Sequence, residues 1–97
     1  MLSKKRSHYV YIVRCADRTL YTGTTWNLRA RVARHNGLLS GGAKYTLPRR
    51  PVFLSHIERF DTLSEARRRE YEIKQLSRAE KQELIERTTK EQLLAAL

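Results

Sequence analysis

The fold of this chain is decided by residues 9–35, which read YVYIVRCADRTLYTGTTWNLRARVARH. The first seven residues are mostly β-branched or aromatic, which is typical of a buried strand. A polar break predicts a hairpin turn, and residues 20–23 predict a second strand. From Leu28 the apolar spacing becomes helical, because Leu28 and Val32 lie four apart, and the residues just before can cap a helix. The stretch therefore predicts a compact β-β-α unit.

Two polar residues of the predicted helix lie on one face. Arg31 and His35 are four residues apart, a spacing that makes helix neighbours. Taken alone, Arg31 is equally well read as a solvated charge, like Arg29 and Arg34, and His35 as a helix-end residue. As a pair beside the apolar stripe, they form a candidate phosphate-facing patch.

The rest of the chain continues as one domain. Residues 51–60 predict a third strand, and Pro51 at its start needs no ladder donor there. Helix starts follow at Thr62, Ser77 and Thr89; the first two each have a glutamate three residues later, as in a capping box. The predicted order is β-β-α-β-α-α, with a short fourth helix at the end. We therefore expect an α+β fold, a small three-stranded sheet flanked by helices, as a single domain over residues 1–97.

Positive charge is the strongest signal in the composition. The chain has 20 Lys and Arg against 10 Asp and Glu, a net charge of +10. Residues 1–75 carry the whole excess, whereas residues 76–97 are balanced. A basic excess of this size favours a polyanionic partner, and nucleic acid is the first candidate.

Other features argue against a membrane or an oxidising compartment. No run of about 18 apolar residues is present, and the basic N-terminus lacks the apolar segment of a secretory signal. The single Cys15 cannot form an internal disulfide and suits a small buried position. We therefore expect a cytoplasmic protein with no membrane partner.

The segment between the predicted helix and the third strand is long for a simple connection. It combines the Gly41-Gly42 pair with three cations, Lys44, Arg49 and Arg50. Tyr45 offers an aromatic surface on which a base can stack. Long loops of this kind are commonly functional, so we expect this one to contact nucleic acid.

Four short motifs occur in an order that resembles the GIY-YIG nuclease family. The first motif is Tyr9-Val10-Tyr11 and the second is Tyr21-Thr22-Gly23, followed by Arg31 on the first helix and Glu70 on a later one. Two positions depart from the usual pattern, since Tyr9 replaces a glycine and Thr22 an apolar residue. The resemblance is greatest to small stand-alone bacterial members, the UPF0213-like branch. The nuclease domain of a eukaryotic structure-selective endonuclease catalytic subunit is also similar.

The resemblance implies a mainly antiparallel sheet, a nuclease core over residues 8–78 and a helical extension over residues 79–97. It also implies a metal-dependent active site in which Glu70 holds one Mg²⁺ or Mn²⁺ ion and Gly23 is the motif glycine. The expected catalytic residues are Tyr11, Tyr21, Arg31, His35 and Glu70. The expected nucleic-acid contacts are Arg29, Arg34, Lys44, Tyr45, Arg49 and Arg50.

Each main candidate also has an ordinary structural explanation. Glu70 belongs to a stripe with Leu63, Ala66 and Ile73 that should face the core. A carboxylate there is costly unless it is paired or binds a cation, so a buried Glu–Arg pair or a rotated helix is the alternative. The two motif tyrosines equally fit cross-strand aromatic packing. His8 and His56 have no comparable context, and no zinc-type Cys/His spacing is present.

The function expected from these observations is metal-dependent hydrolysis of phosphodiester bonds in nucleic acid. DNA is favoured over RNA, with structured or branched DNA in repair or recombination as the expected substrate. The alternative is a non-catalytic nucleic-acid-binding domain that retains the nuclease fold. A protein-interaction module acting through residues 76–97 is a third alternative.

Overall fold

The computed structural model describes residues 6–97, which form a three-stranded antiparallel sheet with helices on both faces. The elements in chain order are β1 (His8–Cys15), β2 (Leu20–Thr25), α1 (Leu28–His35), the 3₁₀ turn η1 (Leu47–Arg49), β3 (Val52–Phe60), α2 (Leu63–Gln75), α3 (Arg78–Arg87) and α4 (Lys90–Ala96). The predicted α+β class and sheet are confirmed. Within residues 6–97, no helix combines the length and hydropathy needed to cross a membrane.

The strand β1 lies in the middle of the sheet, in the order β2-β1-β3, and pairs antiparallel with both neighbours. Helix residues also pack on both faces of this strand, which explains the unbroken apolar run in its sequence. The side chains of Val10, Tyr11, Ile12 and Val13 are all fully buried. Alternation along the strand divides them between two separate clusters.

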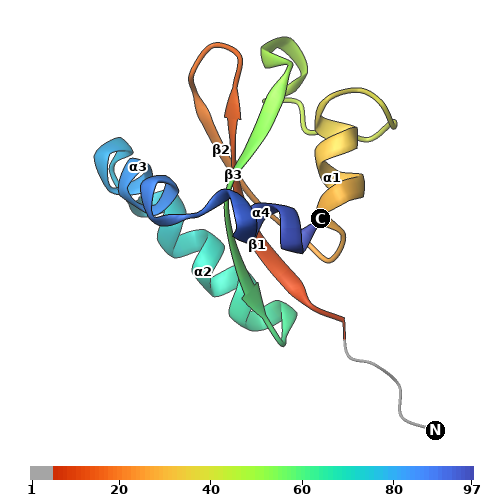
Figure 1. Ribbon diagram of the computed structural model, residues 1–97. Helices are drawn as coiled ribbons and strands as arrows, with labels where there is room; N and C mark the ends of the chain where they lie inside the picture. The colour runs from red at the N-terminus through yellow and green to blue at the C-terminus, as the bar shows by residue number, and fades with distance from the viewer. Residues whose placement is uncertain (1–5) are drawn as a thin grey trace, which may run out of the picture.

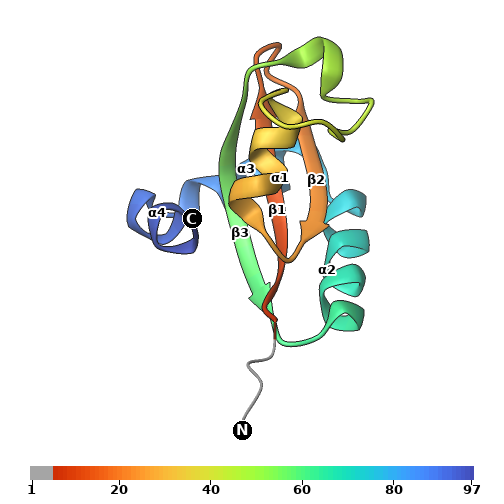
Figure 2. The same ribbon diagram turned by 90° about the vertical axis from the view of Figure 1, so that its right-hand side faces the viewer.

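The two clusters hold the sheet between α1 and α2 (Figures 1 and 2). On one face, Tyr11 and Val13 pack with Leu28 of α1, and Ala96 of α4 packs against the same cluster. The second face is lined by Val10 and Ile12, which pack with Ala66 and Ile73 of α2. The strands β2 and β3 are the two edges of the sheet, and α2 also packs against β2.

Helix starts follow the predicted caps with one difference. Ser77 and Thr89 form complete capping boxes with Glu80 and Gln92. At α2 the Thr62 hydroxyl accepts from the Glu65 backbone N–H at 3.1 Å, but the Glu65 carboxylate accepts from that same hydroxyl instead of from the backbone. The capping box predicted there is therefore only half formed.

The apolar stripe on α2 faces the core over only part of its length. Ala66 and Ile73 are fully buried, but Leu63 is 40% exposed and the Glu70 side chain is 22% exposed. The expectation that all four positions face the core is wrong for Leu63 and Glu70. They lie where α2 passes the edge of β2, and both line a pocket there.

A partly buried ionic network ties β3 to α2 and to the end of α3. Arg69 donates to both carboxylate oxygens of Glu58 at 2.8 and 3.1 Å, and His56 Nε2 lies 2.8 Å from the same carboxylate. On its other side, His56 Nδ1 lies 2.6 Å from the hydroxyl of Thr88, the C-cap of α3. Burial alone would raise the pKa of Glu58, but the hydrogen bonds from His56 and Arg69 lower it to about 2.

This network predicts a pH-dependent contribution to stability. Because the pKa of Glu58 is about 2 in the folded chain and 4.5 for an ordinary glutamate, the contribution is complete above pH 4.5 and is lost as the pH falls through 2. Glu58→Gln should lower the free energy of unfolding at pH 7 by about 1–3 kcal/mol. The same substitution should also flatten the pH dependence of the free energy of unfolding between pH 2 and 4.5. Urea unfolding across this range measures both effects, with exposed Glu86→Gln as the control. An equal effect in the two variants would contradict the assignment.

Candidate active site

Gly23 leaves the space in which the Tyr11 ring of the candidate site packs. It pairs with Tyr11 across the β1–β2 ladder. A Cβ atom at residue 23 would lie 2.4 Å from Tyr11 Oη and 2.6 Å from Cζ. The Tyr11 ring therefore lies directly against the backbone of β2. Glycine is required here for space, because any side chain would displace the ring.

The Tyr11 hydroxyl lies in a chain of hydrogen bonds with a defined direction. Thr46 Oγ1 donates to the Ala43 carbonyl at 3.0 Å, so it accepts from His35 Nδ1 at 3.0 Å. The other ring nitrogen, Nε2, is then unprotonated and accepts from Tyr11 Oη at 2.7 Å. Arg31 Nε donates to the same phenol oxygen at 3.2 Å.

Electrostatics keep both rings of this pair neutral near pH 7. Burial raises the pKa of Tyr11 to about 12, although the hydrogen bond and charge of Arg31 oppose the rise. Burial also lowers the pKa of His35 to about 4, helped by the positive charges of Arg31 and Arg50. The resting state is therefore a neutral phenol that donates to the unprotonated Nε2 of a neutral imidazole.

Tyr21 and Tyr45 form an aromatic stack beside this pair. The Tyr21 ring meets His35 edge-on, with centroids 5.1 Å apart, and stacks on Tyr45 at 5.8 Å. The Arg49 guanidinium lies over the Tyr45 ring, 4.1 Å from its centroid. Tyr45, which the sequence predicts to stack on a base, thus already stacks within the protein between Tyr21 and Arg49.

Two arginines hold the loop before β3 against its neighbours, Arg50 against α1 and Arg49 against the turn between β1 and β2. Arg50 donates to the carbonyls of His35 and Arg34 at 2.6 and 3.3 Å and so satisfies the C-terminal end of α1. Arg49 pairs with Asp17 at 3.0 Å. The glycine pair is not simply flexible, because a Cβ at Gly42 would lie 2.4 Å from the Arg34 carbonyl. Of the cations predicted to contact nucleic acid, three are exposed on the surface: Arg29, Arg34 and Lys44.

Glu70 reaches the site from the other face of the sheet. The Thr24 hydroxyl of β2 donates to one carboxylate oxygen, and Lys74 Nζ lies 2.7 Å from the other. Burial would raise the pKa of Glu70, but the hydrogen bonds from Lys74 and Thr24 lower it overall, so the group is ionised at neutral pH. The alternative of a buried Glu–Arg pair is wrong at this position, because the partner of Glu70 is Lys74; a partly buried Glu–Arg pair occurs instead between Glu58 and Arg69.

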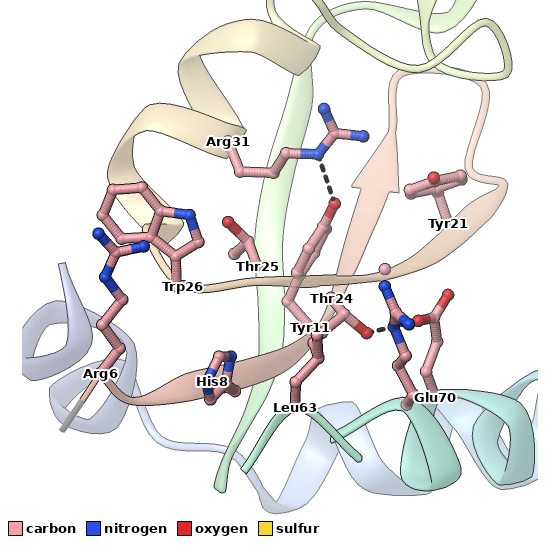
Figure 3. A pocket seen from close by; sticks show the side chains of 12 residues that line it. Arg6, His8, Tyr11, Tyr21, Thr24, Thr25, Trp26, Arg31, Leu63 and Glu70 are labelled. Atoms are coloured by element: carbon pink, nitrogen blue, oxygen red, sulfur yellow. Dashed lines mark hydrogen bonds between the residues drawn. The ribbon is translucent and has the colours of Figure 1, made fainter. Parts of the chain in front are cut away.

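A pocket of about 540 Å³ joins these groups around the edge of β2 (Figure 3). Tyr11, Tyr21, Gly23 and Arg31 contribute to it from the sheet and α1, and Glu70 contributes from α2. His35, which the sequence predicts to form a phosphate-facing patch with Arg31, is instead fully buried and contacts the pocket residues Tyr11 and Tyr21 from behind.

Further residues that line this pocket were not predicted from the sequence. They are Arg6, His8, Thr24, Thr25, Trp26, Leu63 and Arg67. The available signal was a lone tryptophan in the polar connection between the second strand and the helix. His8 was set aside because no sequence neighbour shares its role, and its partners in the pocket come from distant segments.

The donor groups of the pocket suit one hard cation bound with substrate. Among residues 6–97, no three His, Cys, Asp or Glu side chains gather into a metal cluster. Glu70 offers hard oxygen ligands of the kind that Mg²⁺ and Mn²⁺ prefer, with water and phosphate oxygens completing the shell. Both of its oxygens already have protein partners, so an ion must compete with Lys74.

Comparisons with known proteins agree with the motifs and the fold. The model of the GIY-YIG catalytic domain matches residues 7–83. A UPF0213 protein of Staphylococcus haemolyticus is 58% identical over 79 residues, 81% of this chain and 94% of the relative. A UPF0213 protein of Natronomonas pharaonis is 58% identical over 78 residues, 80% and 89% of the two chains. The solution structure of a UPF0213 protein of Bacillus halodurans is 38% identical, with a TM-score of 0.56 over 94% of this chain and 96% of that one.

The contact at Gly23 predicts a specific coupling with Tyr11. Gly23→Ala should destabilise the chain by about 1–3 kcal/mol, because the added methyl group overpacks the Tyr11 ring. In a Tyr11→Ala background the same change should cost much less, since the colliding ring is gone. Urea unfolding of the four proteins of this double-mutant cycle gives the coupling. Additive effects would show that the ring is not what excludes a side chain.

The His35 assignment predicts a low titration midpoint and one tautomer. Nitrogen-detected NMR should show a proton on Nδ1 at pH 7 and protonation of Nε2 only near pH 4. Since the ordinary value is 6.5, folding should lose stability as the pH falls from 6.5 through 4, when only the unfolded chain gains this proton. A titration midpoint above pH 6, or a proton on Nε2 at pH 7, would contradict the direction assigned to this chain of hydrogen bonds.

Proposed function

The chain belongs to the GIY-YIG catalytic-domain family, and we propose that it is a divalent-metal-dependent endonuclease that hydrolyses phosphodiester bonds in nucleic acid. One observation carries this proposal. Tyr11, whose hydroxyl contacts His35 and Arg31, lines the same pocket as the ionised carboxylate of Glu70. A proton acceptor, a phosphate-binding cation and a metal ligand are the minimum set for phosphodiester hydrolysis.

Tyr11 is proposed to receive the proton of the attacking water. Its oxygen donates to His35 and accepts from Arg31, which leaves one lone pair for a further donor. As the water oxygen forms its bond to phosphorus, its proton passes to Tyr11 while the phenol proton passes to His35 Nε2. This coupled transfer avoids a free phenolate, which a pKa of about 12 makes costly, and places the charge on His35 instead, where the lowered pKa of about 4 sets the cost of holding the proton.

Arg31 is proposed to bind the phosphate that is attacked. Its Nε donates to Tyr11 and its Nη1 donates to the Gly41 carbonyl at 2.9 Å. These contacts orient the guanidinium, and the remaining N–H groups are available to an oxyanion. Such preorganised donors stabilise charge that develops in the transition state. Tyr21, packed edge-on against His35, holds the imidazole in place and lines the same wall.

Glu70 is the residue proposed to hold the metal ion. A bound Mg²⁺ or Mn²⁺ would polarise the phosphate and stabilise the leaving oxygen. Thr24 and Lys74 hold the carboxylate in place before substrate arrives. Because a single carboxylate supplies the protein ligands of this site, we expect metal affinity to depend on substrate phosphate.

We further propose DNA with branched or unpaired features, in repair or recombination in the cytoplasm, as the setting for this activity. The net charge of +10 supports a nucleic-acid substrate, and the exposed Arg29, Arg34 and Lys44 are the proposed backbone contacts. Arg49, Arg50 and Tyr45 support the site through α1 and the loop. Residues 8–78 form the proposed nuclease core, with residues 79–97 as its helical extension.

The second candidate function is non-catalytic binding of nucleic acid. The observation that favours it is the saturation of Glu70, whose two oxygens already contact Thr24 and Lys74. If Lys74 were never displaced, the positive charge needed beside the carboxylate would be supplied by the protein, and no ion would enter. Cleavage that requires added metal separates the two functions.

A nuclease assay with matched variants tests the proposal. Labelled duplex, flap, four-way-junction and single-stranded DNA are incubated with Mg²⁺, Mn²⁺ or EDTA. Glu70→Gln should abolish metal-dependent cleavage while binding persists. Tyr11→Phe removes the hydroxyl that passes the proton from water to His35, so it should abolish cleavage. Arg31→Ala should lose on the order of 10²–10³-fold in cleavage rate, more than it loses in affinity.

Glu72→Gln is the control, because this carboxylate lies two residues along the same helix and outside the pocket. It should leave the rate unchanged. If the wild type cuts no substrate with either metal, the binding function takes precedence. If Glu70→Gln unfolds, as judged by circular dichroism, Glu70 is a structural residue.

A further inference from the structure

Trp26 is a large apolar side chain left exposed at the mouth of the pocket. It follows the last residue of β2 and is 55% exposed. Arg6 lies over its ring, with the guanidinium carbon 4.3 Å from the ring centroid. Single exposed apolar residues are common on protein surfaces. Trp26 differs because it lines the same pocket as the candidate catalytic residues.

The backbone that carries Trp26 is firmly held. Thr25 Oγ1 accepts from the Asn27 N–H at 3.1 Å and contacts the Asn27 carbonyl at 3.3 Å, so the two residues are linked across Trp26. The Asn27 side chain caps α1 by accepting from the Ala30 N–H at 3.1 Å. The indole therefore projects from a rigid joint between strand and helix, which limits the entropy lost when a ligand packs on it.

The surroundings of Trp26 suit part of a nucleotide. Arg6 and Arg67 supply positive charge and Leu63 supplies an apolar wall, all lining the one pocket. In Figure 3, Trp26 and Arg6 lie at the end of the pocket away from Glu70, and His8 lies between that end and Leu63. A chain whose phosphate lies at Arg31 and Glu70 could thus place a neighbouring base at Trp26.

We propose that Trp26 is a stacking platform for an unpaired nucleobase next to the phosphate that is cleaved. Bases within a duplex are covered on both faces by their neighbours, so only an unpaired or displaced base can offer a face to the indole. Arg6 covers one face of the ring and supplies the phosphate-binding charge, and the base stacks on the other. This inference rests on the proposed nucleic-acid function of the pocket, and it names single-stranded or frayed structures as its substrate class.

Intrinsic fluorescence tests the platform directly, because Trp26 is the single tryptophan of the chain. Wild-type protein is titrated in EDTA, without turnover, with a short oligothymidylate and with a blunt GC-rich duplex of equal length. Stacking should quench the emission with the single strand, and the duplex should produce little quenching. Equal quenching by both, or none with a bound single strand, would overturn the proposal.

Variant affinities, measured by anisotropy of labelled oligothymidylate in EDTA, provide the second test. Trp26→Ala should weaken binding about 5- to 150-fold, the range for one stacked base. Trp26→Phe should retain most of the affinity. Tyr71→Ala is the matched control, since Tyr71 is a 67% exposed aromatic residue that does not line the pocket. It should bind like the wild type.

The outcomes distinguish this inference from the nuclease proposal. If Trp26→Ala is folded and binds the single strand like the wild type, or if Trp26→Ala and Tyr71→Ala weaken it equally, the platform is overturned. If binding behaves as expected but no substrate is cut with metal, the nuclease proposal fails and the platform stands. If neither oligonucleotide binds at low salt, both fail.

Discussion

The packing of the Tyr11 ring on the bare backbone of Gly23 is the contact on which the site depends. It places the phenol of the central strand against the edge strand β2, where Tyr11 lines the pocket. The phenol oxygen is 2.7 Å from His35 and 3.2 Å from Arg31. One contact thus links β1, β2 and α1, and through His35 it also links Thr46 in the following loop. A side chain at position 23 would disturb all four segments together.

The edge position of β2 explains how groups from opposite faces of the sheet reach one pocket. Tyr11 and Arg31 lie on the α1 face, whereas Glu70 belongs to α2 on the other. At a central strand, another strand would separate them. At an edge they meet around a single strand, and Thr24 of that strand donates its hydroxyl to Glu70. The ion pair with Lys74 favours the charged form of this carboxylate. On the other face of the sheet, burial raises the pKa of Tyr11.

Positive charge in this protein divides into structural and available groups. Arg50 satisfies the end of α1, Arg49 pairs with Asp17 and stacks on Tyr45, and Arg69 holds Glu58. These guanidinium groups are committed to the fold, which net charge alone does not reveal. Exposed cations such as Arg29 and Lys44 are left to attract a polyanion. The basic composition therefore overstates the number of phosphate contacts that the surface can offer.

The sequence by itself determined the elements, because strand and helix periodicity, caps and turn residues act over a few positions. The apolar run from Val10 to Val13 indicated a buried strand, and the cap residues Ser77 and Thr89 located two helix starts. Motif order pointed to Tyr11, Arg31 and Glu70 as candidate site residues. Only the tertiary structure decided that His35 is buried behind Tyr11, that Glu70 pairs with Lys74, and that His8, Trp26 and Arg67 line the same pocket. Periodicity says which face a side chain takes, but partners from distant segments are chosen by sheet order and helix packing.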